Sequence, residues 1–164
     1  MDCPGRSPIN WRSPQVGLDF SSEMIDVARN RQGWCVPPGG ILGPQLVRAD
    51  ALRLPFASDL FAAVSVGYGL RNLADVRLAL LEIKRVLRPG GRLGILDTCR
   101  PNGALLRTLY RLYVLRCIPA IARIIHGSGE MYRYLASSAL TFLTPAELRG
   151  QCASVGLRVE LVNR

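Results

Sequence analysis

The residues best suited to chemistry stand directly after apolar runs of the sequence, at points where a strand of a sheet would end. The most prominent run extends from Phe61 to Val66, and its apolar residues predict a buried strand. It is followed by two glycines and a polar pair, namely Gly67, Gly69, Arg71 and Asn72. In an open α/β sheet, ligands bind beyond the carboxyl ends of the strands, where glycines let the backbone approach them closely. The stretch from Phe61 to Asn72 is therefore predicted to form the centre of a ligand site.

Two acidic residues occupy the same kind of position. Asp19 ends a short apolar run and precedes a helix start, where a strand-tip carboxylate can accept hydrogen bonds from both ribose hydroxyls of an adenosine-containing cofactor. Asp50 follows the run Gln45–Arg48, and its carboxylate can accept a hydrogen bond from the exocyclic amine of an adenine. A helix dipole also favours an acid near a helix N-terminus, and this explanation accounts for Asp19 equally well.

The polar pair must be positioned by strands and helices, and the pattern around it predicts a right-handed βαβ unit in a parallel sheet. Asp75 is a plausible N-cap, and proline and glycines at Arg88–Gly91 end the helix before a second strand, Leu93–Asp97. The apolar residues that follow Asn72 recur every three or four positions, at Leu73, Val76, Leu80, Ile83 and Leu87.

Further elements are predicted on both sides of this unit. A strand ends at Asp19, and a helix capped by Ser21 or Ser22 runs to about Arg31. Met24, Ile25, Val27 and Ala28 are expected to lie on or near its buried face. Gln45–Arg48 is predicted to be a strand, and the Gly/Pro-rich segment Gly33–Pro44 before it a loop of no assigned function.

The C-terminal half is predicted to be largely helical. Helices are expected from Ala104 to about Cys117 and from Glu130 to Ala139. The aromatic residues of this half could cap an apolar substrate, although ordinary helix packing explains them equally well. Thr144, Pro145 and Glu147 have the form of a capped helix start; that helix should end at Gly156, before a last strand over Leu157–Val162.

Composition restricts the classes of protein that fit. The chain has 164 residues and a net charge of +9, with Lys84 the single lysine among its 21 basic residues. Such charge suits a polyanion or an anionic membrane, but no basic run is dense enough for a nucleic-acid arm, and a solvated basic surface is the plainer interpretation. The five scattered cysteines and one histidine argue against a disulfide scaffold and a metal site, and favour a reducing compartment.

Several segments together resemble the S-adenosylmethionine-dependent C-methyltransferases of ubiquinone and menaquinone biosynthesis. Gly67–Asn72 and the Tyr-x-Tyr-Leu segment at Tyr132 are the most specific of them, and the form Gly-Tyr-Gly-Leu-Arg-Asn is similar to the phylloquinone branch. The matching segments are Gly17–Ser21, Asp50–Phe56, Gly67–Asn72, Arg85–Gly91 and Tyr132–Ser138. The resemblance implies a class I methyltransferase, an α/β protein with a Rossmann-like, mostly parallel sheet.

The resemblance also implies a role for each matching residue. Arg71 and Asn72 would be catalytic: a cation stabilises the phenolate-like ring and an amide orients the ring or a water that removes its proton. The alternative for Arg71 is a salt bridge or a loop clamp. The S-adenosylmethionine contacts would be Asp19, Phe20, Met24, Asp50, Ala51 and Gly67. Contacts to a prenylated quinol would come from Tyr68, Tyr110, Tyr113, Tyr132, Tyr134 and Phe142.

Part of the family pattern is not found in the sequence. Members begin with a strand and a glycine-rich turn, and none precedes Asp19. In the expected strand order 3-2-1-4-5-7-6, the central strand one is therefore missing, and so is strand seven. We therefore expect a partial domain over residues 15–164, with a helical insert at about 101–142 and an irregular tail at 1–14, and weak binding of S-adenosylmethionine at best.

These expectations leave three readings of the chain. The first is a quinol methyltransferase at the periphery of a membrane, in the cytoplasm or in an organelle, with a plastid favoured over a mitochondrion. It could form a homo-oligomer, and no nucleic-acid partner is expected. The second is a truncated, non-catalytic paralogue that binds a partner. A dinucleotide-dependent oxidoreductase is the third, and it would need a Gly-x-Gly-x-x-Gly turn that the sequence does not contain.

Overall fold

The computed structural model describes residues 14–31, 44–100, 103–117, 140 and 142–160. They belong to two compact units, Met1–Pro55 and Phe56–Arg164, and each unit is described by itself. The expected N-terminal tail, the loop at Gly33–Pro44 and the helix at Glu130–Ala139 fall almost entirely outside the described residues.

In the first unit, two parallel strands are joined through a helix. The elements are β1 (Val16–Asp19), α1 (Ser22–Arg31) and β2 (Gln45–Arg48), with Asp19 opposite Arg48 in the ladder. Both predicted strands and the helix are confirmed. Ser21 is the residue that caps α1, because its Oγ accepts a hydrogen bond from the Met24 amide at 3.2 Å.

The buried face predicted for α1 is wrong in part. Ile25 is buried, whereas Met24 and Val27 are exposed and Ala28 is half-buried. A ten-residue helix beside a two-stranded ladder covers one narrow stripe of side chains, and Ile25 alone lies within it.

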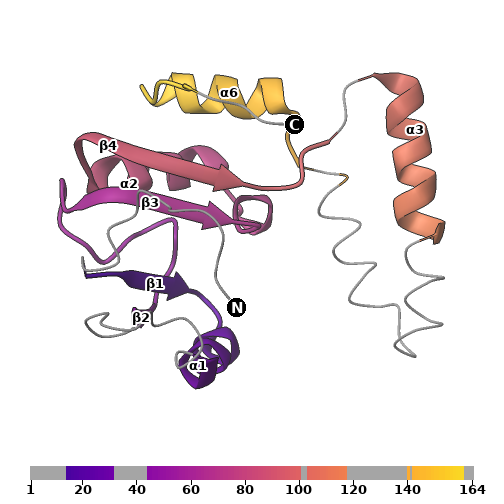
Figure 1. Ribbon diagram of the computed structural model, residues 1–164. Helices are drawn as coiled ribbons and strands as arrows, with labels where there is room; N and C mark the ends of the chain where they lie inside the picture. Colours follow the sequence, from indigo (N-terminus) through magenta and orange to yellow (C-terminus); the bar gives the residue numbers. More distant parts are fainter. Residues whose placement is uncertain (1–13, 32–43, 101–102, 118–139, 141, 161–164) are drawn as a thin grey trace, which may run out of the picture. The chain divides into compact units, whose positions relative to one another are not determined.

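The second unit contains the predicted βαβ unit. Strand β3 (Phe61–Gly67) leads through the short 3₁₀ helix η2 (Leu70–Asn72) into α2 (Val76–Val86), and β4 (Leu87–Leu96) then pairs with β3 in parallel (Figure 1). Asp75 caps α2 as predicted, because its Oδ1 accepts a hydrogen bond from the Leu78 amide at 2.9 Å. The strand after the helix begins at Leu87, earlier than the predicted Leu93, and Gly90 takes a left-handed φ of 75°.

The described strands form two parallel pairs, β1 with β2 and β3 with β4. In the expected order 3-2-1-4-5-7-6, β1 and β2 correspond to strands 2 and 3, and β3 and β4 correspond to strands 4 and 5. The parallel α/β class is therefore confirmed. The prediction that Phe61–Val66 is a buried strand is wrong, since no residue of β3 is fully buried. A strand in a two-stranded ladder forms hydrogen bonds along one edge only, and other segments cover only part of its surface. Alternate residues of the strand therefore stay exposed.

The core of the second unit lies where α2 packs against helix α6 (Pro145–Ser154). Leu80 is fully buried there, with Cys152 and Val155. Lys84 supports the same contact, because its ammonium group donates a 2.7 Å hydrogen bond to the Val155 carbonyl at the C-terminal end of α6. The partly buried residues around this cluster are Val76, Leu93, Ile95, Leu148 and Leu157.

Helix α6 begins as predicted, but the chain after it does not form the predicted strand. A complete capping box joins Thr144 and Glu147, with Pro145 in the first turn. The helix ends at Ser154, and Gly156 follows with a left-handed φ of 78°. The described part of the predicted last strand, Leu157–Glu160, has no strand structure, because no ladder partner lies beside it among the described residues.

The predicted helix at Ala104–Cys117 is confirmed. It consists of α3 (Ala104–Leu112) and a π-helical continuation, η3 (Tyr113–Cys117). Leu109, Leu112 and Tyr113 are each about half exposed. Among the described residues, no helix is long and apolar enough to cross a bilayer.

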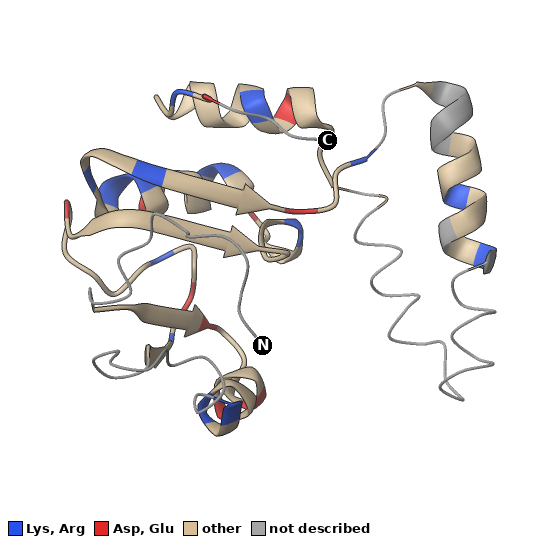
Figure 2. Cartoon of the chain, viewed as in Figure 1, with Lys and Arg blue, Asp and Glu red and all other residues tan. Residues whose placement is uncertain are grey.

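Basic side chains are distributed over the described elements. Figure 2 shows blue segments on α1, α2, α3 and α6. Arg29 forms an exposed ion pair with Asp26, and Arg100 another with Glu147. The described basic side chains are therefore spread over several elements of both units, and some of them are paired with acids.

The capping box of α6 predicts a pH dependence of stability. Hydrogen bonds from the backbone and side chain of Thr144, with the nearby Arg100, hold the pKa of Glu147 below its usual 4.5. A carboxyl whose folded pKa is depressed stabilises the fold above its unfolded pKa, and this stability is lost as the pH falls through the folded pKa. We expect Glu147→Gln to lower the melting temperature at pH 7, and the difference from the wild type to vanish at a pH below the folded pKa.

Thermal unfolding followed by circular dichroism at several pH values measures this difference. Thr144→Ala is the comparison variant, because it removes the hydroxyl that accepts from the Glu147 amide and should cost about 1 kcal/mol at pH 7. Its loss should become smaller at low pH but should not vanish, since the amide of Glu147 stays without this acceptor. A Glu147→Gln difference that stays constant from pH 7 to pH 3 would contradict the assignment.

Candidate functional site

A buried ion pair lies at the carboxyl ends of β3 and β4. The Nη1 atom of Arg71 is 3.4 Å from Oδ1 of Asp97, and the Arg71 backbone amide donates a 3.3 Å hydrogen bond to Oδ2 of the same carboxylate. The side chains of Arg71 and Asp97 are only 8% and 1% exposed. Arg71 follows β3 through η2 and Asp97 directly follows β4, so the parallel pairing of the two strands brings them together.

Thr98 completes the hold on the arginine. Its backbone amide donates a 2.8 Å hydrogen bond to Asp97 Oδ1, and its Oγ1 accepts one from Arg71 Nη1 at 3.4 Å. The Nε of Arg71 is buried and has no hydrogen-bond partner among the described residues. The guanidinium therefore has donor capacity left after Asp97 and Thr98.

Tyr68 and Asn72 stand next to this arginine. Tyr68 takes a left-handed φ of 54°, unusual for a residue with a side chain, while its amide donates a 2.7 Å hydrogen bond to the Leu96 carbonyl. Its ring centroid is 5.4 Å from the Arg71 guanidinium carbon, within cation–π range, and about half of the residue is exposed. The exposed Asn72 donates a 3.4 Å hydrogen bond from its side-chain amide to the Tyr68 carbonyl.

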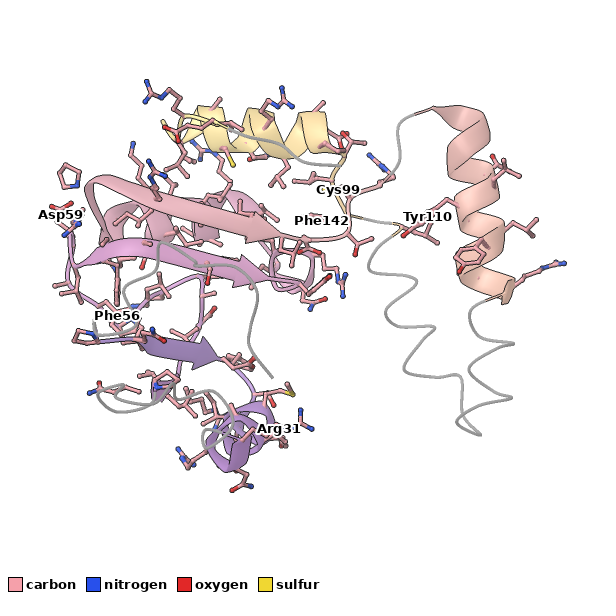
Figure 3. The ribbon with its side chains drawn as sticks, viewed as in Figure 1. Arg31, Phe56, Asp59, Cys99, Tyr110 and Phe142 are labelled. Carbon is pink, nitrogen blue, oxygen red and sulfur yellow. The ribbon has the colours of Figure 1, made fainter. Side chains whose placement is uncertain are left out.

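Cys99 follows on the same segment (Figure 3). Burial, and then the negative charge of Asp97, raise the pKa of its thiol above the usual value of 9.0. The thiol is therefore protonated at neutral pH, and a thiol in this state is a poor nucleophile. Cys99 is accordingly not assigned a covalent role.

The adenosine-binding candidates of the first unit lie at one edge of its ladder. Oδ1 of Asp19 accepts a 2.8 Å hydrogen bond from the Ser21 amide, and the Asp19 carbonyl accepts one from Ala49 at 3.1 Å. Asp50 follows directly, and its exposed carboxylate accepts a 2.9 Å hydrogen bond from the Leu52 amide, within the turn that holds Ala51. The parallel ladder thus places Asp19 and Asp50 at the same carboxyl edge.

These residues fit the adenosine part of the predicted cofactor. Carboxylates are suited to ribose hydroxyls and to an adenine amine. Phe20 is 70% exposed and Met24 54% exposed, so both present apolar surface beside Asp19 that an adenine could cover. Gly67, in the second unit, ends β3 opposite Leu96, and a Cβ built on it would meet no atom within 4 Å. Open space at this glycine suits close approach of a ligand to the backbone.

The aromatic residues predicted to contact the substrate differ in their exposure. Tyr110 is half-buried on α3, and Tyr113 is exposed on η3. Phe142 is only 5% exposed, and Figure 3 shows it near the chain that leaves β4. Tyr132 and Tyr134 lie outside the described residues.

Sequence reasoning missed two members of the site, Asp97 and Thr98, as partners of Arg71. The predicted strand already ended on Asp97, so its place at the carboxyl edge was available from the sequence. What the sequence does not show is its pairing with a residue 26 positions earlier. The structure brings together Tyr68, Arg71 and Asn72 in one unit, and Asp19, Phe20, Met24, Asp50 and Ala51 in the other.

Comparison with known proteins gives a consistent family. The family model described as the ubiE/COQ5 methyltransferase family matches residues 8–160. A demethylmenaquinone methyltransferase of Mycolicibacterium paratuberculosis is 40% identical over 92% of this chain and 71% of its own length. Those of Mycobacterium tuberculosis and Deinococcus radiodurans are 43% and 37% identical over 86% and 92% of this chain. The chain spans 56% and 61% of the lengths of these two relatives.

Solved structures agree on the fold. A putative methyltransferase of Haloferax volcanii, in complex with the activator Trm112, superposes with a TM-score of 0.62 at 22% identity, over 90% of this chain and 52% of its own. The YcgJ protein of Bacillus subtilis gives a TM-score of 0.59 at 20% identity, over 87% of this chain and 51% of its own. At such identities the likeness concerns the fold alone.

Proposed function

The chain belongs to the ubiE/COQ5 methyltransferase family, and on this premise we propose that it transfers a methyl group from S-adenosylmethionine to a ring carbon of a prenylated quinol. The observation that carries the proposal is the buried Arg71 guanidinium, with donor capacity to spare, at the carboxyl end of a parallel βαβ unit. The curated relatives are demethylmenaquinone methyltransferases, which favours a naphthoquinol ring of the demethylmenaquinol type.

The residues of the second unit are proposed to act on the quinol. A ring carbon becomes nucleophilic as its hydroxyl loses a proton, and the fixed charge of Arg71 stabilises the oxyanion that develops. The side chain of Asn72, on the same 3₁₀ turn, orients the ring hydroxyl or the water that takes its proton. Tyr68, whose ring lies below the Arg71 guanidinium carbon at 5.4 Å, offers an exposed aromatic surface to the quinol ring.

The residues of the first unit are proposed to hold the cofactor. Asp19 binds the ribose hydroxyls, Phe20 and Met24 cover the adenine, and Asp50 with Ala51 contacts its edge. The open space at Gly67 would admit the methionyl part. When bound, S-adenosylmethionine supplies an electrophilic methyl group, so the task of the protein is to bind, orient and exclude water.

We also propose that the protein works at the periphery of a membrane in a reducing compartment, because a prenylated quinol is dissolved in lipid. Half-exposed Leu109, Leu112 and Tyr113, with Arg111 on the same helix, support a surface contact through α3 and η3. The phylloquinone branch and a plastid location are the finer form of this proposal, and they are supported only by the form of Gly67–Asn72.

The proposal is tested by calorimetry and by a methyl-transfer assay. S-Adenosylmethionine is titrated into the wild-type chain and into Asp19→Ala, and methyl transfer to a short-chain demethylmenaquinol is followed by mass spectrometry. We expect Asp19→Ala to weaken binding about 10- to 100-fold, the loss of one or two hydrogen bonds to a charged group. Val27→Ala, an exposed change on the neighbouring helix, is the control.

A folded wild-type chain that neither binds S-adenosylmethionine nor transfers its methyl group would contradict the proposal and favour a non-catalytic binding module.

A further inference from the structure

Asp97 is committed to Arg71 more fully than an ordinary ion pair requires. It is almost completely buried, and it accepts two hydrogen bonds from Arg71: one from the backbone amide to Oδ2 and one from Nη1 to Oδ1. The third donor is the amide of Thr98, whose own hydroxyl also accepts from Nη1. The carboxylate therefore holds both the backbone and the side chain of Arg71.

The geometry of the Arg71–Asp97 ion pair is nevertheless weaker than that of a bidentate ion pair. Arg85 and Glu82, in the same unit, form a bidentate pair through Nε and Nη2 at 2.9 and 2.8 Å. Of the guanidinium nitrogens of Arg71, only Nη1 donates to Asp97, at 3.4 Å. The buried Nε has no acceptor among the described residues. Charge-assisted hydrogen bonds are usually shorter, and a buried pair of this kind gains little stability over apolar packing. The arrangement holds one corner of the guanidinium and leaves other donors unused.

We propose that Asp97, assisted by Thr98, is a positioning residue that fixes the orientation of the Arg71 guanidinium, so that its unused donors are available to the substrate oxygen. The inference rests on the proposed function. The guanidinium carbon of Arg71 lies over the Tyr68 ring, 5.4 Å from its centroid, so a substrate oxygen is expected to approach from a side that this ring does not occupy. An arginine already held in place loses less conformational entropy when the oxyanion develops.

The orientation of Arg71 can be measured without any ligand. In protein labelled with ¹³C and ¹⁵N at arginine, the Arg71 guanidinium signal is identified by its loss in Arg71→Lys. We expect rotation about its Cζ–Nε bond to become about tenfold faster in Asp97→Asn, the effect of losing one charge-assisted hydrogen bond. Thr98→Val should act in the same direction to a smaller extent, and it serves as the second variant if Asp97→Asn does not fold.

Kinetics then connect orientation with chemistry. We expect Asp97→Asn to lower kcat for methyl transfer about 100-fold with little change in KM, since misplacement of a catalytic group affects the transition state. In the Arg71→Lys background the same change should cause little further loss, because its effect passes through Arg71. Glu82→Gln, which breaks the Arg85 pair of the same unit, is the matched control and should leave kcat unchanged.

The rotation and kinetic measurements can each overturn the inference. Unchanged rotation of Arg71 in both Asp97→Asn and Thr98→Val would overturn the inference, and so would faster rotation with an unchanged kcat. Additive losses in the double variant would assign Asp97 a role that does not pass through Arg71, which would also overturn it. If the wild type shows no methyl transfer while Asp97→Asn still releases Arg71, the proposed function fails and the positioning of the guanidinium stands.

Discussion

Replacing Arg71 with leucine is expected to lower the free energy of unfolding by about 3–5 kcal/mol at neutral pH. The reason is the partner that stays behind: the side chain of Asp97 is 1% exposed, and among the described residues Arg71 is the only side-chain cation that pairs with it. A buried carboxylate that loses its cation still bears the cost of its lost hydration, and the two remaining hydrogen bonds from backbone amides offset that cost only in part. Urea denaturation followed by far-ultraviolet circular dichroism measures the change.

The double variant Arg71→Leu/Asp97→Leu distinguishes this cause from damaged packing. Removal of both charges should recover most of the loss, because replacing a buried pair by apolar groups is often close to neutral. Arg29→Leu is the control for an exposed pair: Arg29 and Asp26 are 59% and 65% exposed, and this change should cost less than about 1 kcal/mol. An Arg71→Leu loss no larger than that of Arg29→Leu would refute the assignment.

Leu80→Ala is expected to lower the free energy of unfolding by about 2–5 kcal/mol. Leu80 is fully buried between α2 and α6, in the cluster that contains Cys152 and Val155. Truncation to alanine removes the transfer free energy of the side chain and leaves a cavity that two helices can close only in part. Urea denaturation at constant pH gives the difference in free energy.

Leu81→Ala is a matched control one position along the same helix. Leu81 is 38% exposed, so it buries less apolar surface and leaves no closed cavity; the expected loss is below about 1 kcal/mol. Equal losses for Leu80→Ala and Leu81→Ala would mean that α2 does not present the face described here to α6.

The two predictions concern parts of the second unit with different roles. The Leu80 cluster packs α2 against α6 and thereby supports the βαβ unit. The Arg71–Asp97 pair lies at the carboxyl edge of that unit, where stability and function compete. A buried Nε of Arg71 that finds no acceptor in the described part of the chain costs free energy, and such a cost is typical of sites whose polar groups are arranged for a ligand.

The elements and caps of the fold could be predicted because their causes are local in the sequence. The 3.6-residue period of apolar side chains indicated α2, and short apolar runs indicated β1, β2 and β3. The caps at Ser21, Asp75 and Thr144 depend on hydrogen bonds to amides three residues away. Such contacts need no knowledge of the rest of the chain.

Burial and pairing could not be predicted in this way, because they depend on segments far apart in the chain. The exposure of Met24 and Val27, the open surface of β3 and the absence of a strand over Leu157–Glu160 all follow from which neighbours pack beside each element. The same holds for the site. The sequence placed Arg71 and the end of a strand at Asp97 separately, and the parallel register of β3 and β4 joined them into one buried pair.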